Sequence, residues 1–152
     1  MSNKFSIVTN YLVSIFEANS LVNTISLRDD DVIDVEKENV YPLVSMRLIE
    51  SPAPQRNLRE YTYLFEVLNQ RDFQGKATPS KLLTDENYID NIGVCDSIAN
   101  DFLMEVLKTH NDFNINVSDD SISTFEPIRK DERNCLDGIR FEATFYINQN
   151  AI

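Results

Sequence analysis

The sequence predicts a single α+β domain over residues 1–152, in which a mostly antiparallel sheet is flanked by an N-terminal helix and a long central helix. Two segments, 3–18 and 85–109, carry apolar side chains at helical spacing. Several other segments alternate apolar and polar side chains, as half-buried strands do. A chain of 152 residues has the length of one domain and can bury a core.

The composition indicates a folded, acidic protein. Hydrophobic residues make up 42% of the chain and include nine Phe and six Tyr, so global disorder is not expected. The net charge is −11, from 25 acidic and 14 basic residues. Tight binding to a nucleic-acid backbone needs clustered Lys and Arg, so this charge works against it. It suits a solvated coat, or a surface along which DNA passes without adhering.

Targeting and redox signals are sparse. No apolar run approaches the roughly 20 residues of a membrane helix, so no membrane association is expected. The first twenty residues have an interrupted apolar stripe, which does not resemble a secretory signal. We expect Cys95 and Cys135 to be two separate buried thiols, as in a cytosolic protein, and not a disulfide.

The N-terminal half alternates between helix and strand patterns. Residues 3–18 predict an amphipathic helix packed on a sheet. Its apolar stripe consists of Phe5, Val8, Leu12, Ile15 and Phe16. Residues 21–28 alternate in the manner of a strand. Residues 29–40 are rich in acids that repel one another, so we expect an exposed excursion.

A β-hairpin is predicted next. Residues 41–51 read as a strand that tolerates Pro42 near its start, and residues 52–60 read as a proline-containing connection. Residues 61–71 give the clearest strand pattern, with one face formed by Tyr61, Tyr63, Phe65 and Val67. These segments predict an antiparallel pair with a long tip.

The C-terminal half begins with the longest helix, expected over 85–109 after an N-cap at Thr84. Lys108 and His110 near its end complement the helix dipole. Its buried stripe is expected to contain Ile92, Cys95, Ala99, Phe102, Val106 and Leu107. Short strands are expected at 113–117 and 123–129, separated by a turn at Asp119–Asp120. The closing strand, 138–147, has an apolar face of Ile139, Phe141, Ala143 and Phe145.

Candidate catalytic and metal sites are weak. The single histidine, His110, fits a helix-end cation better than a general base, and it has no flanking signature of a catalytic triad. The acids of 29–38 lack the central Gly of a calcium loop and are interrupted by Val32 and Ile33. We therefore expect a solvated or partner-facing acidic loop, no metal, no cofactor and no enzymatic activity.

The order of features resembles the tail terminator, or tail completion, proteins of tailed bacteriophages over roughly residues 5–147. "LVNTISLRDDDVIDVEKENVYPLVSMRLIES" is similar to the strand, acidic excursion and "(F/Y)PL" strand of that family. "NIGVCDSIANDFLMEVL" is similar to its long helix. "STFEPIRKDERNCLDGIRFEATFYI" is similar to its closing hairpin, with Ile128 at an aromatic position, Asn134 and Leu136 in the turn, and Gly138 at the glycine.

The resemblance implies a structural virion protein without enzymatic activity. Such proteins form rings, usually hexameric, that cap the tail tube, stop its polymerisation and present a surface to the head connector, while DNA passes through. The expected partners are further copies of the chain, the tail-tube protein and head-connector or neck proteins. The chain would act in the tail or neck of the virion after assembly in the host cytoplasm. Candidate interface residues are Asp29, Asp30, Asp31, Asp34, Arg56, Arg59, Arg129, Lys130 and Arg133.

Three alternatives remain open from the sequence. The ring could contain six or twelve copies, and the chain could be another neck or head-completion ring protein. A monomeric acidic adaptor that binds one protein partner is the hypothesis from a different class. The segments 29–40 and 51–60 lack the chemistry of tight hairpin turns, so we expect contacts with other chains to order them.

Overall fold

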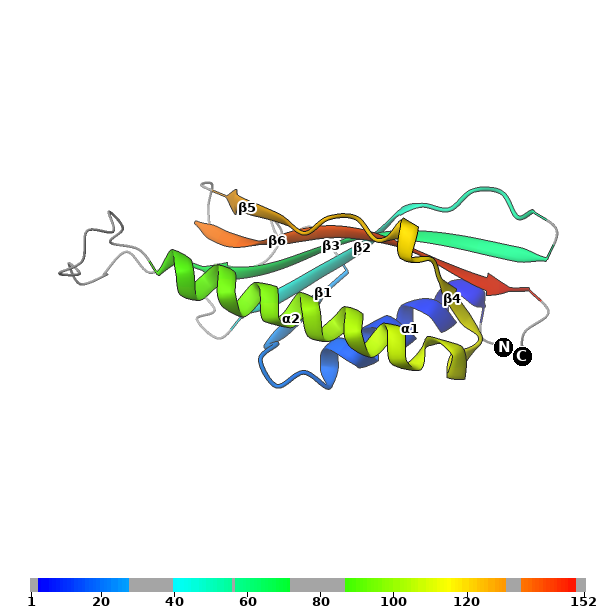
Figure 1. Ribbon diagram of the computed structural model, residues 1–152, viewed down its shortest axis with the longest axis horizontal. Coiled ribbons are helices and arrows are strands. Elements are labelled where there is room, and N and C mark those ends of the chain that lie inside the picture. Colours follow the sequence, from blue (N-terminus) through cyan, green and yellow to red (C-terminus); the bar gives the residue numbers. More distant parts are fainter. Residues whose placement is uncertain (1–2, 28–39, 56, 72–86, 131–134, 150–152) are drawn as a thin grey trace.

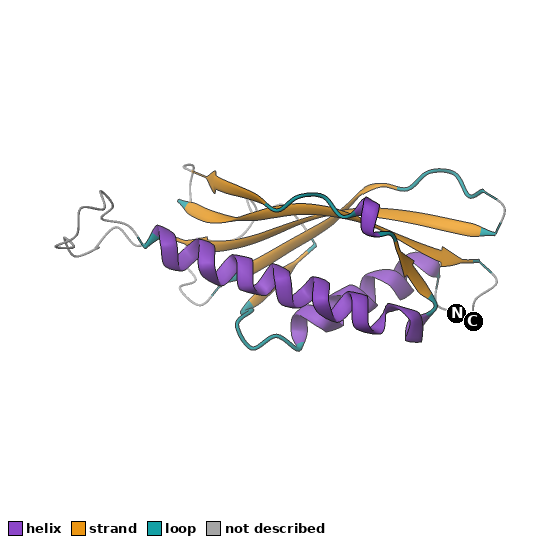
Figure 2. Ribbon diagram, in the orientation of Figure 1, coloured by secondary structure: helices purple, strands orange, loops and turns teal. Residues whose placement is uncertain are grey.

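The computed structural model describes residues 3–27, 40–55, 57–71, 87–130 and 135–149. Its elements are α1 (Lys4–Glu17), β1 (Thr24–Ser26), β2 (Leu43–Glu50), β3 (Leu58–Gln70), α2 (Tyr88–Thr109), η2 (His110–Phe113), β4 (Ile115–Val117), η3 (Asp119–Ser121), β5 (Glu126–Lys130) and β6 (Leu136–Asn148). The sheet has the strand order β1-β2-β3-β6-β4, and β5 also pairs with β6. Both helices pack on one side of it (Figures 1 and 2). The predicted α+β fold is confirmed.

Helix α1 forms where the periodicity predicted it. Asn3 caps its first turn, because the side-chain oxygen accepts a hydrogen bond from the backbone N–H of Ser6 at 2.7 Å. The buried side of the helix includes Val8, Leu12 and Phe16. Phe5, the first residue of the predicted stripe, is instead 40% exposed, with its ring centroid 5.9 Å from that of Tyr61.

The predicted hairpin is confirmed, with a shorter first strand and a longer second strand than expected. β2 and β3 pair antiparallel, with Phe65 opposite Met46, and β3 continues against β6 along its whole length. Residues 58–60 belong to β3 and not to the connection, because β6 is long enough to pair with them. β3 thus lies at the centre of the sheet, where both neighbouring strands satisfy its backbone groups.

The strand predicted at 21–28 is much shorter. Only Thr24–Ser26 forms β1, which pairs parallel to β2 at the edge of the sheet. Before it, Asn23 donates a side-chain hydrogen bond to the carbonyl of Tyr41 at 2.6 Å. This bond joins the residue before β1 to the segment before β2, so the two strands begin side by side, with Thr24 opposite Leu43.

Helix α2 keeps the predicted C-terminal end and differs elsewhere. Its N-cap residue is Asn87, and the predicted cap at Thr84 lies outside the described ranges. Leu107, which the sequence placed in the buried stripe, is 43% exposed. The reason is geometric: it follows the buried Val106 and is therefore rotated by about 100° around the helix from it.

The segment predicted as a strand over 113–117 begins as a strand only at Ile115. Phe113 completes the short helix η2, and Asn114 then adopts a left-handed backbone with φ of 56°. Asparagine tolerates this conformation better than most residues, so the chain can turn sharply into β4. The second predicted strand likewise starts late, at Glu126, and extends to Lys130.

The core between the sheet and the helices is aromatic. Phe65 lies at its centre, with ring centroids 4.8 Å from Phe141 and 5.1 Å from Phe102. Phe16 of α1 stacks on Phe102 of α2 at 4.1 Å. The predicted burial of Phe65, Phe102, Phe141 and Phe145 is confirmed.

Candidate interaction surface

The helices cover one face of the sheet, and we call the opposite face the open face. Cross-strand register arranges its side chains in rows. The row at one end is apolar, because Leu43, Leu68, Gly138 and Ile128 lie opposite one another on β2, β3, β6 and β5. Tyr41 and its neighbours cover this row, which forms a second, smaller core.

The next row of the open face is charged. Register aligns Ser45, Glu66, Arg140 and Glu126 across the same four strands. Arg140 Nη2 lies 3.3 Å from Glu66 Oε2, and Lys130 Nζ of β5 lies 3.3 Å from the same oxygen. The Glu66 side chain is almost fully buried, whereas Arg140 keeps 38% of its side chain exposed. One carboxylate therefore holds two cations that still face solvent.

The far end of the open face carries hydroxyl groups. Thr62 and Thr144 lie opposite each other and share a hydrogen bond of 2.8 Å. Beside them, burial raises the pKa of Tyr146, and the neighbouring Glu60 carboxylate raises it further. In the charged row and at the hydroxyl end, hydrogen bonds and ion pairs hold the polar side chains in fixed positions. Such a surface is suited to binding a protein by complementary charge.

The predicted interface residues divide into two groups. The first group lies outside the described residues and consists of Asp29, Asp30, Asp31, Asp34, Arg56 and Arg133. Arg59 is in β3, where Nη2 donates to Ser51 Oγ at 3.1 Å and the guanidinium carbon lies 5.2 Å from the Tyr61 ring centroid. Arg129 and Lys130 belong to β5, which extends one residue beyond the predicted strand 123–129. Lys130 thus joins the charged row of the open face, while Arg59 does not.

A second cluster, of polar and charged side chains, is buried where α2 meets the sheet. No pattern in the sequence indicated it. Arg71 at the end of β3 forms an ion pair with Asp137 of β6, and Asn91 of α2 donates to the other carboxylate oxygen at 3.4 Å. Arg71 Nη2 also donates to the carbonyl of Lys130 at 2.6 Å. Only the three-dimensional register brings these residues together, so residue spacing carried no signal for them. The cluster joins α2, β3, β5 and β6.

The reactive residue types have structural roles in the described part of the chain. His110 forms a hydrogen bond between Nδ1 and the carbonyl of Ile115 at 2.7 Å. Burial raises the pKa of the Cys95 thiol to about 12, so a thiolate is not accessible near neutral pH. Neither Cys95 nor Cys135 forms a disulfide, as expected, but only Cys95 is buried, whereas Cys135 is half-buried. Within the described ranges, no three His, Cys, Asp or Glu side chains come close enough to share a metal ion.

Comparison with known proteins adds no relative. No protein-family model matches the chain, and no curated protein matches it. Among the helices of the described ranges, none has both the length and the apolar character needed to cross a membrane. The open face is therefore interpreted from its own residues.

Proposed function

We propose that this chain is a structural virion protein of a tailed bacteriophage, in which copies form a ring at the tail or neck. The ring ends polymerisation of the tail tube and joins the tail to the head connector, with DNA passing through its centre. The order of helices and strands supports this proposal, because α1, the β2–β3 pair, α2 and the closing strands follow the order that the family resemblance implies.

The observation that carries the proposal is the open face. In a two-layer domain the helices bury one sheet face and leave the other for solvent or for a partner. Here that face carries a fixed row of opposite charges, in which Glu66 holds Arg140 and Lys130. A neighbouring copy, or the tail-tube or connector protein, would bind by matching this row.

The overall charge supports the passage of DNA. A net charge of −11 repels phosphate groups, so a ring lined by this chain would not hold the DNA that moves through it. Binding of DNA without sequence preference would require the opposite charge on the lining. The ring would assemble in the host cytoplasm and remain in the virion.

The acidic segment 29–40 provides the test. Exchange of Asp29, Asp30 and Asp31 for Asn should leave the fold intact and impair assembly, most strongly at low salt, where charges are least screened. The matched control exchanges Asp112, Asp119 and Asp120, which are exposed, for Asn and removes the same charge. Normal assembly of the first variant, measured by light scattering across a salt series, would show that this segment is not an interface.

A further inference from the structure

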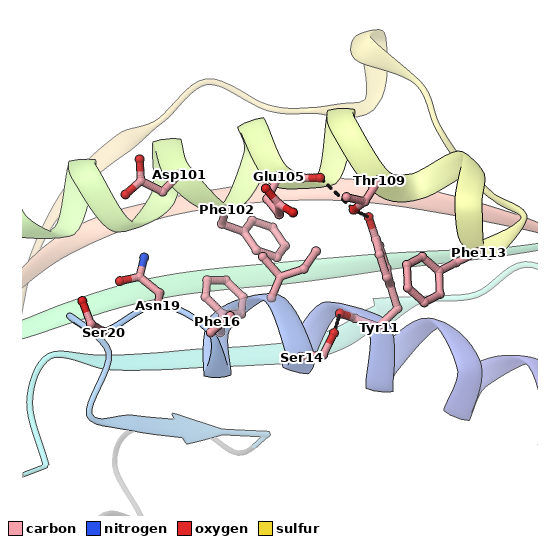
Figure 3. A pocket seen from close by; sticks show the side chains of 12 residues that line it. Tyr11, Ser14, Phe16, Asn19, Ser20, Asp101, Phe102, Glu105, Thr109 and Phe113 are labelled. Atoms are coloured by element: carbon pink, nitrogen blue, oxygen red, sulfur yellow. Dashed lines mark hydrogen bonds between the residues drawn. The ribbon is translucent and has the colours of Figure 1, made fainter.

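A groove separates the C-terminal halves of α1 and α2 on the side of the molecule away from the open face (Figure 3). Its volume is about 630 Å³, which lies within the range of sites that hold a ligand or a few side chains. Its lining includes the aromatic rings of Tyr11, Phe16, Phe102 and Phe113. It also includes two acidic residues of α2, Asp101 and Glu105. The groove thus combines apolar surface with carboxylates.

The aromatic lining is held in place by contacts within the chain. Phe16 and Phe102 stack with an interplanar angle of 3°. The Tyr11 ring lies 4.7 Å from that of Phe113, and the Tyr11 hydroxyl shares a hydrogen bond of 2.8 Å with Thr109 Oγ1 (Figure 3). Phe113 nevertheless remains 50% exposed, because nothing within the described ranges covers its outer side. The groove is therefore preformed and accessible.

The charge in the groove is negative and unbalanced. Asp101 and Glu105 are exposed, lie one helical turn apart, and form no ion pair with any described residue. The last turns of both helices contribute to the groove, and helix C-termini carry partial negative charge. Burial raises the pKa of Tyr11, and the carboxylates of Glu105 and Asp112 raise it further, which reports the same negative field.

We propose that this groove binds a segment of another protein that presents a lysine or arginine beside an apolar side chain. The cation would lie between Asp101 and Glu105, where two exposed carboxylates attract positive charge. The apolar side chain would cover the exposed part of Phe113. A nucleic acid does not fit, because the carboxylates repel phosphate. This inference goes beyond the ring proposal and does not depend on it.

The test uses the full chain and two fluorescently labelled peptides. One is a short amphipathic peptide of lysine and leucine, and the other has glutamate in place of lysine. The Asp101→Asn, Glu105→Gln variant should raise the Kd for the lysine peptide by about tenfold or more. The control Asp96→Asn, Asp120→Asn removes the same charge from exposed positions outside the groove and should leave the Kd within about twofold. Phe113→Ala should also weaken binding.

Several results would overturn the proposal. If the two double variants weaken binding of the lysine peptide equally, the peptide responds to the net charge of the protein and not to the groove. Equal binding of the glutamate peptide, or no binding of the lysine peptide to the wild type, would show that the groove does not select a basic segment. If Asp101→Asn, Glu105→Gln lowers the mass of the assembled protein and the control does not, the occupant is a second copy of the chain, and the assignment to a different protein is wrong.

Discussion

Asp137 Oδ1 lies 3.3 Å from Arg71 Nε, and both side chains are buried. This ion pair joins the end of β3 to the start of β6, and Asn91 links it to α2. Desolvation makes such a pair a modest source of net stability, but removal of one partner leaves the other charge buried and uncompensated. The effect of this pair on the free energy of unfolding should therefore be largest when one partner is removed.

Asp137→Asn should lower the free energy of unfolding by about 3–5 kcal/mol, because Arg71 loses its counter-charge in a buried site. Urea denaturation followed by circular dichroism measures the change. The control is Asp96→Asn, which makes the same exchange at an exposed position of α2 and should cost less than about 0.5 kcal/mol. Equal stability of the two variants would contradict a buried, charge-compensated pair.

Phe141→Ala should cost roughly 3–5 kcal/mol, because it opens a cavity where the rings of Phe65 and Phe125 now pack at 4.8 and 5.0 Å. Phe113→Ala removes the same side chain from a half-exposed position and should cost much less. The same denaturation measurement applies. A wild-type unfolding curve for Phe141→Ala would show that β6 does not face the helices.

The two thiols should form no disulfide and should differ in reactivity. A reducing agent should leave the melting temperature unchanged, because Cys95 and Cys135 form no disulfide. Cys95 should resist alkylation near neutral pH in the folded protein, since burial and the nearby Asp137 raise the pKa of its thiol to about 12. Mass spectrometry after timed alkylation measures the extent of modification at Cys95 and at Cys135. A large drop in melting temperature on reduction would reveal a disulfide and contradict this structure.

Periodicity along the chain was sufficient to predict the main elements. The alternation of Tyr61, Tyr63 and Phe65 predicts β3 because each buried side chain recurs at every second residue. The stripe that includes Val8 and Leu12 predicts α1 for the corresponding reason at helical spacing. Errors occurred at the ends of elements, where a three-residue edge strand or a left-handed residue ends the pattern.

The charge clusters could not be predicted in the same way. Glu66 and Arg140 are 74 residues apart and become neighbours only through the register of β3 against β6. The apolar alternation fixes which face each side chain occupies, but a shift of the register by two residues would preserve the faces and separate this pair. The groove between α1 and α2 has the same origin, since it depends on how two distant helices pack.

The central claim is that copies of this chain assemble into a ring, and the mass of the purified protein tests it most directly. Size-exclusion chromatography with light scattering should give six times the 17.5 kDa of one chain, and electron microscopy of the same fraction should show rings. Twelve times that mass would keep the ring and change its number. A mass of 17.5 kDa at every concentration and salt, with no rings when the tail-tube protein is added, would contradict the account.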